Sequence, residues 1–243
     1  MCFHTSQTKK VVELENRYNV SLTIDDARDV YDIPRYHMNG FTHPDMLIIP
    51  QEEPSALVPS LWGIVPNNKK PKQIREYYKE AVRYGGGLNA QSEKLFEHFI
   101  YKKSAFTRRC IVPVTGFFEP HEYKSKKYPF HIKHQDNRVL SLAGLYTIID
   151  DVVTFTILTK KASTLFTKVH NKKNRQPVLL NEDFEQDWLK DNLTQNEIIE
   201  LINLNYKEEG LSVYTVSRDL FSPKVNSDIM SILDEVKYEG VVI

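Results

Sequence analysis

The sequence predicts one α+β domain over residues 1–243, with a curved antiparallel or mixed sheet as a barrel-like core and helices on its flanks. Two observations lead to this fold class. Segments rich in β-branched and aromatic residues are interleaved with helical segments, without the regular strand-helix-strand alternation of a parallel sheet. The chain also contains no internal repeat and no low-complexity linker that would divide it. With 41% hydrophobic residues, one hydrophobic core is the economical arrangement.

The N-terminal part of the chain is expected to combine short helices with strands bounded by prolines. Apolar residues at mixed helical spacing predict a short helix over residues 6–18. Short apolar runs between prolines predict strands over residues 45–66. A helix is expected over residues 71–84, because it starts at a proline and three glycines follow it. A second short helix is expected over residues 92–100.

From Arg109 onward the sequence changes to β character. Strands are expected over residues 110–118, 128–134, 139–149 and 152–159. The second and third of these flank an Asp-Asn pair that is typical of turns, so they are predicted to form a hairpin.

The C-terminal part is expected to place helices around one late strand. Helices are predicted over residues 181–191 and 194–205, and the second opens with the capping box Thr194/Glu197. A strand is expected over residues 211–216 and a last helix over residues 228–236.

The composition restricts the class of protein. Lys and Arg number 32, Asp and Glu number 32, and the formal net charge is zero, so any contact with nucleic acid must depend on a local patch. No apolar run approaches the roughly 18 to 20 residues of a membrane span, and no secretory leader is evident, so we expect a soluble, cytoplasmic protein. The two cysteines, Cys2 and Cys110, predict no disulfide framework, and we expect no metal and no cofactor.

Cys2 is the residue of greatest chemical interest. Removal of Met1 would make it an N-terminal residue and hence a 1,2-aminothiol, whose amine titrates near 8 and thiol near 8.5. The amine can form a Schiff base with an aldehyde, and the adjacent thiolate can then close a thiazolidine ring. A cysteine at this position can also be an accident of where the chain starts.

Four further segments contain polar residues that could carry chemistry, and each also has a structural interpretation. The segments are residues 88–93, residues 108–119, residues 169–170 together with 175–180, and residues 225–228. Glu119 is either a solvated turn residue or an acid-base group, and His170 is either an exposed loop histidine or a functional one. Asn89 could simply cap a helix. Trp62 is more often a core residue than a base-stacking platform.

Taken together and in this order, these segments resemble the SOS-response-associated peptidase (SRAP) family, also described as the abasic-site processing proteins. Members begin Met-Cys-Gly-Arg and carry Trp-Gly-Leu-Ile-Pro and Asn-Ala-Arg segments. They continue with an Arg-Arg-Cys-Leu-Ile-Pro segment that runs to Gly-Phe-Tyr-Glu-Trp, and with a His-x-Arg-Met-Pro segment. The similarity extends from Cys2 to about Asp228, nearly the whole chain.

The resemblance implies that the partner is single-stranded DNA containing abasic sites. It implies that Cys2 forms a thiazolidine with the ring-opened sugar aldehyde and that Asn89 holds the N-terminal amine or the sugar. Glu119 would shuttle protons during formation and reversal of the crosslink, and His170 would exchange a proton with the sugar oxygen. The implied DNA-binding residues are His4, Trp62, Gln91, Arg108, Arg109, Thr159, Lys172 and Arg175.

The chain departs from the family pattern at several of these positions. His4 and Gln91 stand where the family has arginines, and Pro120 stands where it has tryptophan. Two charge-assisted phosphate contacts are then missing. Residues 171–174 also replace the single family residue between His170 and Arg175, and nearby lysines could rebuild a phosphate-binding surface.

Three functions are compatible with these observations. The leading one is an enzyme of DNA damage repair, associated with the SOS response, that uses lyase-like Schiff-base chemistry and acts as a monomer. A noncovalent single-stranded DNA-binding module is the second, and it would leave no heat-stable adduct with abasic DNA. The third is a cysteine peptidase acting on its own N-terminus, with Cys2 and His170 as nucleophile and base.

Overall fold

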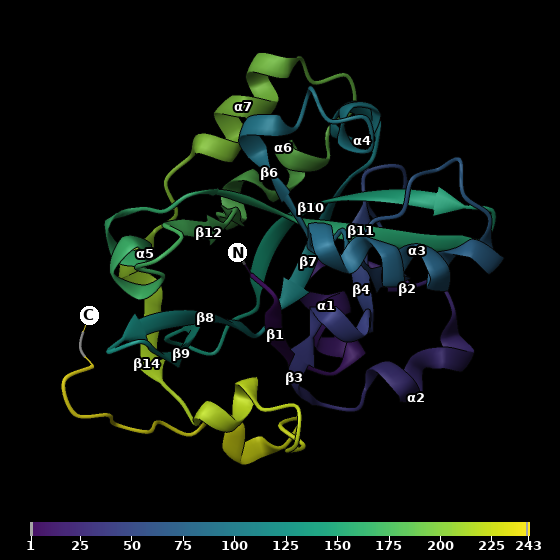
Figure 1. The fold of residues 1–243 in the computed structure, drawn as a ribbon. Helices are drawn as coiled ribbons and strands as arrows, with labels where there is room; N and C mark the ends of the chain where they lie inside the picture. The colour runs from purple at the N-terminus through teal and green to yellow at the C-terminus, as the bar shows by residue number, and fades with distance from the viewer. Residues whose placement is uncertain (1, 242) are drawn as a thin grey trace.

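The core of the molecule is a closed ring of five strands, in a computed structural model that describes residues 2–241 and residue 243 (Figure 1). The strands of the ring, in spatial order, are β11 (Val152–Lys161), β10 (Leu140–Ile149), β7 (Arg109–Val114), β4 (Asp45–Pro50) and β5 (Ala56–Trp62). Neighbouring strands are antiparallel, except that a parallel pairing of β11 with β5 closes the ring. The predicted barrel-like core of mixed pairing is confirmed.

Short strands extend this barrel. They are β2 (Ser21–Leu22) on β5, β6 (Asn89–Gln91) and β12 (Arg175–Pro177) on β11, and β13 (Leu179–Leu180) on β10. Because β6 and β12 join the same strand, the Asn-Ala-Gln segment and the Arg-Gln-Pro segment lie close together although they are far apart in sequence.

A second, five-stranded antiparallel sheet lies beside the barrel (Figure 1). Its strands, in spatial order, are β14 (Leu211–Thr215), β9 (Lys126–His134), β8 (Gly116–Tyr123), β1 (His4–Gln7) and β3 (Arg35–Asn39). The chain passes from β7 in the barrel to β8 in this sheet across Thr115 alone, whose N–H donates to the carbonyl of Ser6 at 2.8 Å. This corner brings the end of the motif 108–119 beside the N-terminal strand.

Seven short α-helices flank the sheets in the described part of the chain. They are α1 (Val11–Tyr18), α2 (Arg28–Tyr31), α3 (Ile74–Ala81), α4 (Tyr101–Thr107), α5 (Thr164–Val169), α6 (Glu185–Leu189) and α7 (Gln195–Asn203). In Figure 1, α4, α6 and α7 gather at one end of the molecule, and α5 lies near β8 and β12. Within the described residues, no helix is both long and apolar enough to cross a membrane.

The predictions with matched start and stop signals are confirmed. Residues 71–84 form a helical segment around α3, and Gly85 follows it with the left-handed φ of 89° that the glycine stop indicates. Helix α7 begins at the predicted capping box, in which Glu197 N donates to the Thr194 hydroxyl at 3.3 Å. The strands at 45–66, 152–159 and 211–216 also form, with small differences at their ends.

The predicted hairpin of residues 128–134 and 139–149 is wrong. β9 pairs with β8 and β14, whereas β10 pairs with β7, β11 and β13, so the turn near Asn137 connects two different sheets. The hairpin that β9 does form turns at Lys124 and Ser125, with φ values of 48° and 60°. Neither lysine nor serine is typical of such a turn. The turn forms here because β8 and β9 pair along their whole length.

Other boundaries also differ from the predictions. Residues 6 and 7, expected to open the helix over residues 6–18, belong instead to the strand His4–Gln7, because β3 and β8 supply hydrogen-bonding partners on both sides. The helix itself begins at Val11. The strand expected at 110–118 is two strands, divided at Thr115. Residues 92–100 contain only a 3-10 turn at Ser92–Lys94, and the last predicted helix contains only the 3-10 turn Met230–Leu233.

Candidate functional site

Cys2 lies two residues before β1, an inner strand of the five-stranded sheet, and neighbouring segments fix its position. β1 pairs with β8 on one side and with β3 on the other. The N–H of Gly40 donates to the carbonyl of Phe3 at 2.8 Å, and Nδ2 of Asn89 donates to the carbonyl of Cys2 at 2.8 Å. Cys2 is fully buried. Met1, on whose removal the expected chemistry depends, lies outside the described residues.

The surroundings of the Cys2 thiol disfavour its thiolate form. Burial raises the pKa of this thiol well above its ordinary value, and the negative charge of nearby Glu119 raises it further. Near neutral pH the thiol is therefore mostly protonated, and it must give up a proton when it reacts.

Glu119 and His170 form a buried pair near Cys2. Glu119 lies on β8 with no exposed surface, and His170 follows α5 and is 4% exposed. Oε2 of Glu119 lies 2.9 Å from Nδ1 of His170, and the same nitrogen lies 3.2 Å from the carbonyl oxygen of Arg175. Two acceptors at Nδ1 indicate that this nitrogen carries the proton, so a neutral imidazole has its acceptor at Nε2.

Polar side chains outside the family motifs hold His170 in place. The His121 Nδ1 contacts two carbonyl oxygens in the last turn of α5, at 2.9 and 3.2 Å. The Asn171 side chain accepts from the N–H of Glu122 at 2.9 Å and donates to the carbonyl of Glu122, also at 2.9 Å. Both His121 and Glu122 lie on β8, the strand of Glu119. Sequence reasoning did not single out His121 or Asn171, although Asn171 belongs to the noted insertion.

Asn89 is held from the barrel side by a glycine turn and by Trp62. The three glycines before Leu88 have φ values of 89°, 64° and 70°, and a Cβ on Gly87 would lie 2.6 Å from the Ile64 carbonyl oxygen. The next carbonyl, that of Leu88, accepts from Nε1 of Trp62 at 3.0 Å. Trp62 has no exposed surface. It positions the Leu88–Asn89 backbone, and its burial removes it from the expected base-stacking surface.

A pocket of about 380 Å³ opens beside these residues. Its lining combines aromatic side chains with lysines, histidines and a carboxylate. The lining residues are Phe3, His4, Phe41, Pro120, Glu122, Lys127, His170, Lys172, Lys173 and Phe221. Lys172 forms an ion pair with Glu122 at 2.7 Å. The inserted loop therefore contributes cations to the rim of the pocket that contains His170.

His4 reaches this pocket as an uncharged residue. Burial, together with the neighbouring His37, lowers the pKa of His4 to about 3. Nδ1 of His4 lies 2.9 Å from Nε2 of His37, whose Nδ1 lies 2.6 Å from the hydroxyl of Ser227. Asp228 accepts from the N–H of His37 at 3.1 Å. The C-terminal motif 225–228 thus supports the strand beside His4, and His4 lacks the charge of the arginine it replaces.

Gln91, Thr159 and Arg175 form a separate group on the barrel edge. Gln91 on β6 is aligned with Thr159 on β11. Arg175 donates to the carbonyl and hydroxyl of Thr159 at 2.7 and 3.1 Å and pairs with Glu93 at 2.6 Å. Thr159 is fully buried. It supports Arg175 and does not itself reach the surface.

The adjacent arginines 108 and 109 occupy different environments. Arg109 is fully buried, and its guanidinium donates to the carbonyls of Ala105, Phe106, Trp188 and Lys190. These contacts fasten α4 and α6 to the barrel, so Arg109 is a structural residue and not the expected DNA contact. The Arg108 side chain is 25% exposed and lies 3.5 Å from Glu52.

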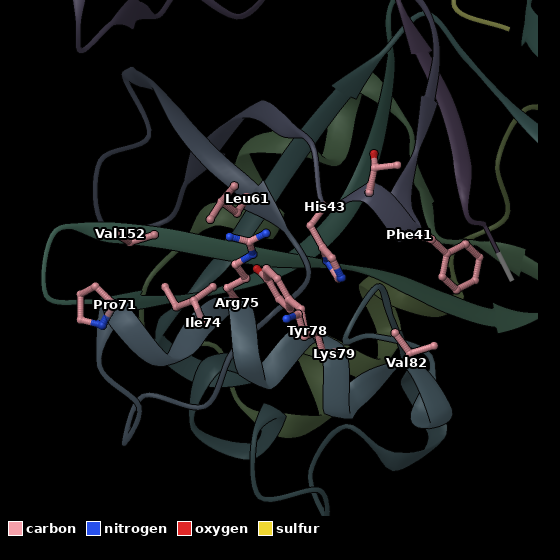
Figure 2. Close-up of a pocket in the computed structure, with 11 residues that line it drawn as sticks. Phe41, His43, Leu61, Pro71, Ile74, Arg75, Tyr78, Lys79, Val82 and Val152 are labelled. Carbon is pink, nitrogen blue, oxygen red and sulfur yellow. The ribbon is translucent and has the colours of Figure 1, made fainter. Parts of the chain in front are cut away.

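A groove of about 570 Å³, larger than the pocket that His170 lines, lies along α3 (Figure 2). Its wall contains the parallel stack of His43 on Tyr78, with ring centroids 3.6 Å apart. Nδ1 of His43 lies 2.8 Å from the carbonyl oxygen of Trp62, and the Tyr78 hydroxyl donates to the Gly63 carbonyl at 2.7 Å. This stack therefore fixes the segment that carries Trp62.

The described residues contain no group of three or more His, Cys, Asp or Glu side chains that could hold a metal ion. They do bring together a thiol, a carboxamide, a carboxylate and an imidazole, which are the groups needed to bind an aldehyde and to transfer protons around it.

The chain belongs to the SOS response associated peptidase (SRAP) family, whose model matches residues 1–223. Among its relatives, the abasic site processing protein YoaM of Bacillus subtilis (strain 168) is 27% identical over 226 residues, which cover 87% of this chain and 94% of that protein. The abasic site processing protein YMR114C of Saccharomyces cerevisiae is 29% identical over 167 residues, covering 65% of this chain and 42% of that protein.

Solved structures share the fold. A crystal structure of a protein from Bacteroides thetaiotaomicron matches with a TM-score of 0.84 and 26% identity, covering 97% of this chain and all of that one. A protein from Bordetella bronchiseptica matches with a TM-score of 0.72 and 20% identity, which supports the fold alone.

Proposed function

We propose that this protein captures abasic sites in single-stranded DNA by forming a covalent thiazolidine through Cys2, after removal of Met1. The observation that carries the proposal is the juxtaposition of Cys2 with Asn89 and with the Glu119–His170 pair, beside a pocket with a cationic rim. Relatives described as abasic site processing proteins support the same substrate class.

The proposed reaction begins at the sugar of the abasic nucleotide. The closed sugar opens when its ring oxygen gains a proton and the hydroxyl at C1′ loses one, which yields an aldehyde. His170 lines the pocket, and its Nε2 takes the proton of the C1′ hydroxyl and delivers it to the ring oxygen, so that no net proton is gained or lost. The amine of Cys2 then adds to the aldehyde carbon to form a carbinolamine.

Glu119 acts in the following steps. Proton transfer from its carboxyl group helps the carbinolamine hydroxyl to leave as water, which yields an imine. The Cys2 thiol adds to the imine carbon, its proton passes through Glu119 to the nitrogen, and the thiazolidine ring is complete. One water is lost overall, and reversal follows the same steps backwards. Asn89 fixes the Cys2 backbone throughout, through the bond to its carbonyl.

The DNA strand is proposed to contact the rim of this pocket through Lys172, and the neighbouring edge through Gln91 and Arg175. Arg108, which is partly exposed and directly precedes β7, is the remaining candidate for a DNA contact. These contacts would order the backbone without reading its sequence.

The test is incubation of the purified protein with single-stranded DNA that contains one abasic site, followed by denaturing electrophoresis. We expect a heat-stable adduct whose mass is that of protein plus DNA less one water. Cys2→Ser should abolish it, because a serine hydroxyl does not close a stable ring under these conditions. Intact mass spectrometry of the free protein establishes whether Met1 has been removed, and hence whether the sample is competent.

Two other outcomes would redirect the assignment. Binding without any adduct, in protein shown to lack Met1, would favour the noncovalent DNA-binding module. Loss of residues beyond Met1 that depends on Cys2 would favour the autopeptidase.

A further inference from the structure

His170 owes its position to a clamp that is absent from the family motifs. The residue follows a helix of only six residues, α5, and begins the loop that this chain has lengthened. A short helix followed by a loop offers little intrinsic rigidity. Yet Nδ1 of His170 lies within 2.9 Å of Oε2 of Glu119, which is a contact between two buried groups on different elements.

The clamp has two parts, both based on β8. His121 contacts the last carbonyl oxygens of α5, at 2.9 and 3.2 Å, and fixes the end of the helix before His170. Asn171 bridges the N–H and carbonyl of Glu122, at 2.9 Å each, and fixes the chain directly after His170. The Nδ2 of Asn171 also lies 3.4 Å from Nε2 of His121, so the two parts are connected.

The loop beyond the clamp is closed on itself. The N–H of Asn174 donates to the carbonyl of His170 at 3.0 Å, and the carbonyl of Asn174 accepts from the N–H of Ala162 at 2.9 Å. Asn174 has a left-handed φ of 50°, which an asparagine tolerates better than most residues. The extra residues therefore form a compact turn from which Lys172 and Asn171 both reach back to the strand of Glu119. Lys172 pairs with the Glu122 carboxylate at 2.7 Å, whereas Asn171 bonds to the Glu122 backbone.

We propose that Asn171 and His121 are positioning residues that align His170 with Glu119 and with the ring oxygen of the abasic sugar. This inference rests on the proposed function. Asn171 acts through geometry alone, because its amide satisfies both polar groups of one backbone residue and neither gains nor loses a proton. A displacement of His170 by about 1 Å would be enough to reduce the rate on the order of a hundredfold.

Asn181 offers a matched control for Asn171. Its side chain also bridges a backbone carbonyl and a backbone N–H, those of Asn205 at 2.9 Å and Lys207 at 3.2 Å. These residues support β14 and the segment before it and do not line the pocket that contains His170. Asn171→Ala and Asn181→Ala therefore each remove one donor bond and one acceptor bond to the backbone, beside His170 in the first variant and outside its pocket in the second. Because Asn181 is buried and Asn171 is exposed, Asn181→Ala is the more demanding control for a general loss of structure.

The test measures adduct formation by the parent, Asn171→Ala, Asn181→Ala and His170→Ala on two substrates. The first is an ordinary abasic site, whose sugar must open. The second is an oligonucleotide carrying an open-chain aldehyde, which bypasses ring opening. On the first substrate we expect Asn171→Ala to be at least tenfold slower than the parent, and Asn181→Ala to match the parent. On the second substrate Asn171→Ala should recover.

A double variant separates positioning from a general loss of structure. Adding Asn171→Ala to His170→Ala should slow the reaction no further, because the clamp then has nothing left to align. An equal defect of Asn171→Ala on both substrates, or an additive defect in the double variant, would overturn the proposal. If the parent forms no adduct with either substrate, the proposed function fails instead, and the melting temperatures of the variants report only on folding.

Discussion

The two sides of the proposed active site hold their residues by different physical means. On the barrel side, Asn89 is fixed by buried backbone pairing, a glycine turn and the enclosed indole of Trp62. On the opposite side, His170 is fixed by polar side chains that connect β8 with the segment around His170. His121 reaches from β8 to the end of α5, and Asn171 reaches from the loop to the Glu122 backbone near the surface. We infer that changes on the barrel side mainly affect stability, whereas changes on the His170 side mainly affect the rate.

Glu119→Gln is expected to give the largest kinetic effect with little loss of stability. The change keeps the shape of the side chain but removes the proton shuttle, and general acid-base groups typically contribute at least a hundredfold to a rate. Adduct formation and reversal should both slow by about that factor, measured by quenched time courses on abasic single-stranded DNA. A variant that melts at a much lower temperature but crosslinks at the parental rate would make Glu119 a structural residue.

The pH dependence of adduct formation is expected to be the next largest effect. Burial and Glu119 raise the pKa of the Cys2 thiol, so the thiolate fraction continues to increase above the ordinary cysteine pKa of about 8.5. If the thiolate is the attacking species, ring closure should accelerate by up to about tenfold per pH unit from about pH 7 to 9. Glu119→Gln removes a negative charge, so it should lower the pKa and move this rise to lower pH. A profile that levels off near neutrality would contradict the raised thiol pKa.

Trp62→Phe tests the barrel side of the comparison. The substitution leaves a void in a fully buried site and removes the bond from Nε1 to the Leu88 carbonyl. We expect a loss of about 2 kcal/mol in the free energy of unfolding, measured by chemical denaturation. Asn171→Ala should cost clearly less, because its partners Glu122 N and O lie near solvent. Equal losses for the two variants would remove the distinction between the two sides.

The smallest expected effect concerns positions 4 and 91, where this chain lacks the positive charges of the family arginines. His4→Arg/Gln91→Arg should strengthen binding to undamaged single-stranded DNA and steepen the slope of log affinity against log salt, by about 0.7 for each regained phosphate contact. The lowered pKa of His4, about 3, means that the parent carries no charge there. Its affinity should therefore not gain a His4 contribution between about pH 6 and 8. Unchanged slopes would show that these positions do not face DNA.

Local signals predicted the segments whose structure is determined locally. The helix at 71–84 has a proline start and a glycine stop, and α7 has a capping box, so short-range hydrogen bonds and backbone preferences define their ends. The chemistry of an aminothiol pointed to Cys2, and the resemblance of the ordered motifs to the SRAP family pointed to Asn89, Glu119 and His170. What motifs could not show is the distance between residues that lie far apart in the sequence.

Tertiary structure decided which of those residues share a site and which do not. The polar segment His4–Gln7 became a strand only because β3 and β8 lie on either side of it. Two neighbouring arginines differ because the ends of α4 and α6 surround Arg109 with carbonyl groups, while Arg108 remains partly exposed.

The sequence by itself therefore determined the mixed α+β class and the reactive residue types of this protein. The folded structure alone decided the closure of the barrel, the burial of Trp62 and Arg109, the neutral state of His4 and the clamp on His170. The physical reason is the same in each case. Burial, pKa and strand pairing depend on neighbours contributed by distant segments, and these exist only after the chain has folded.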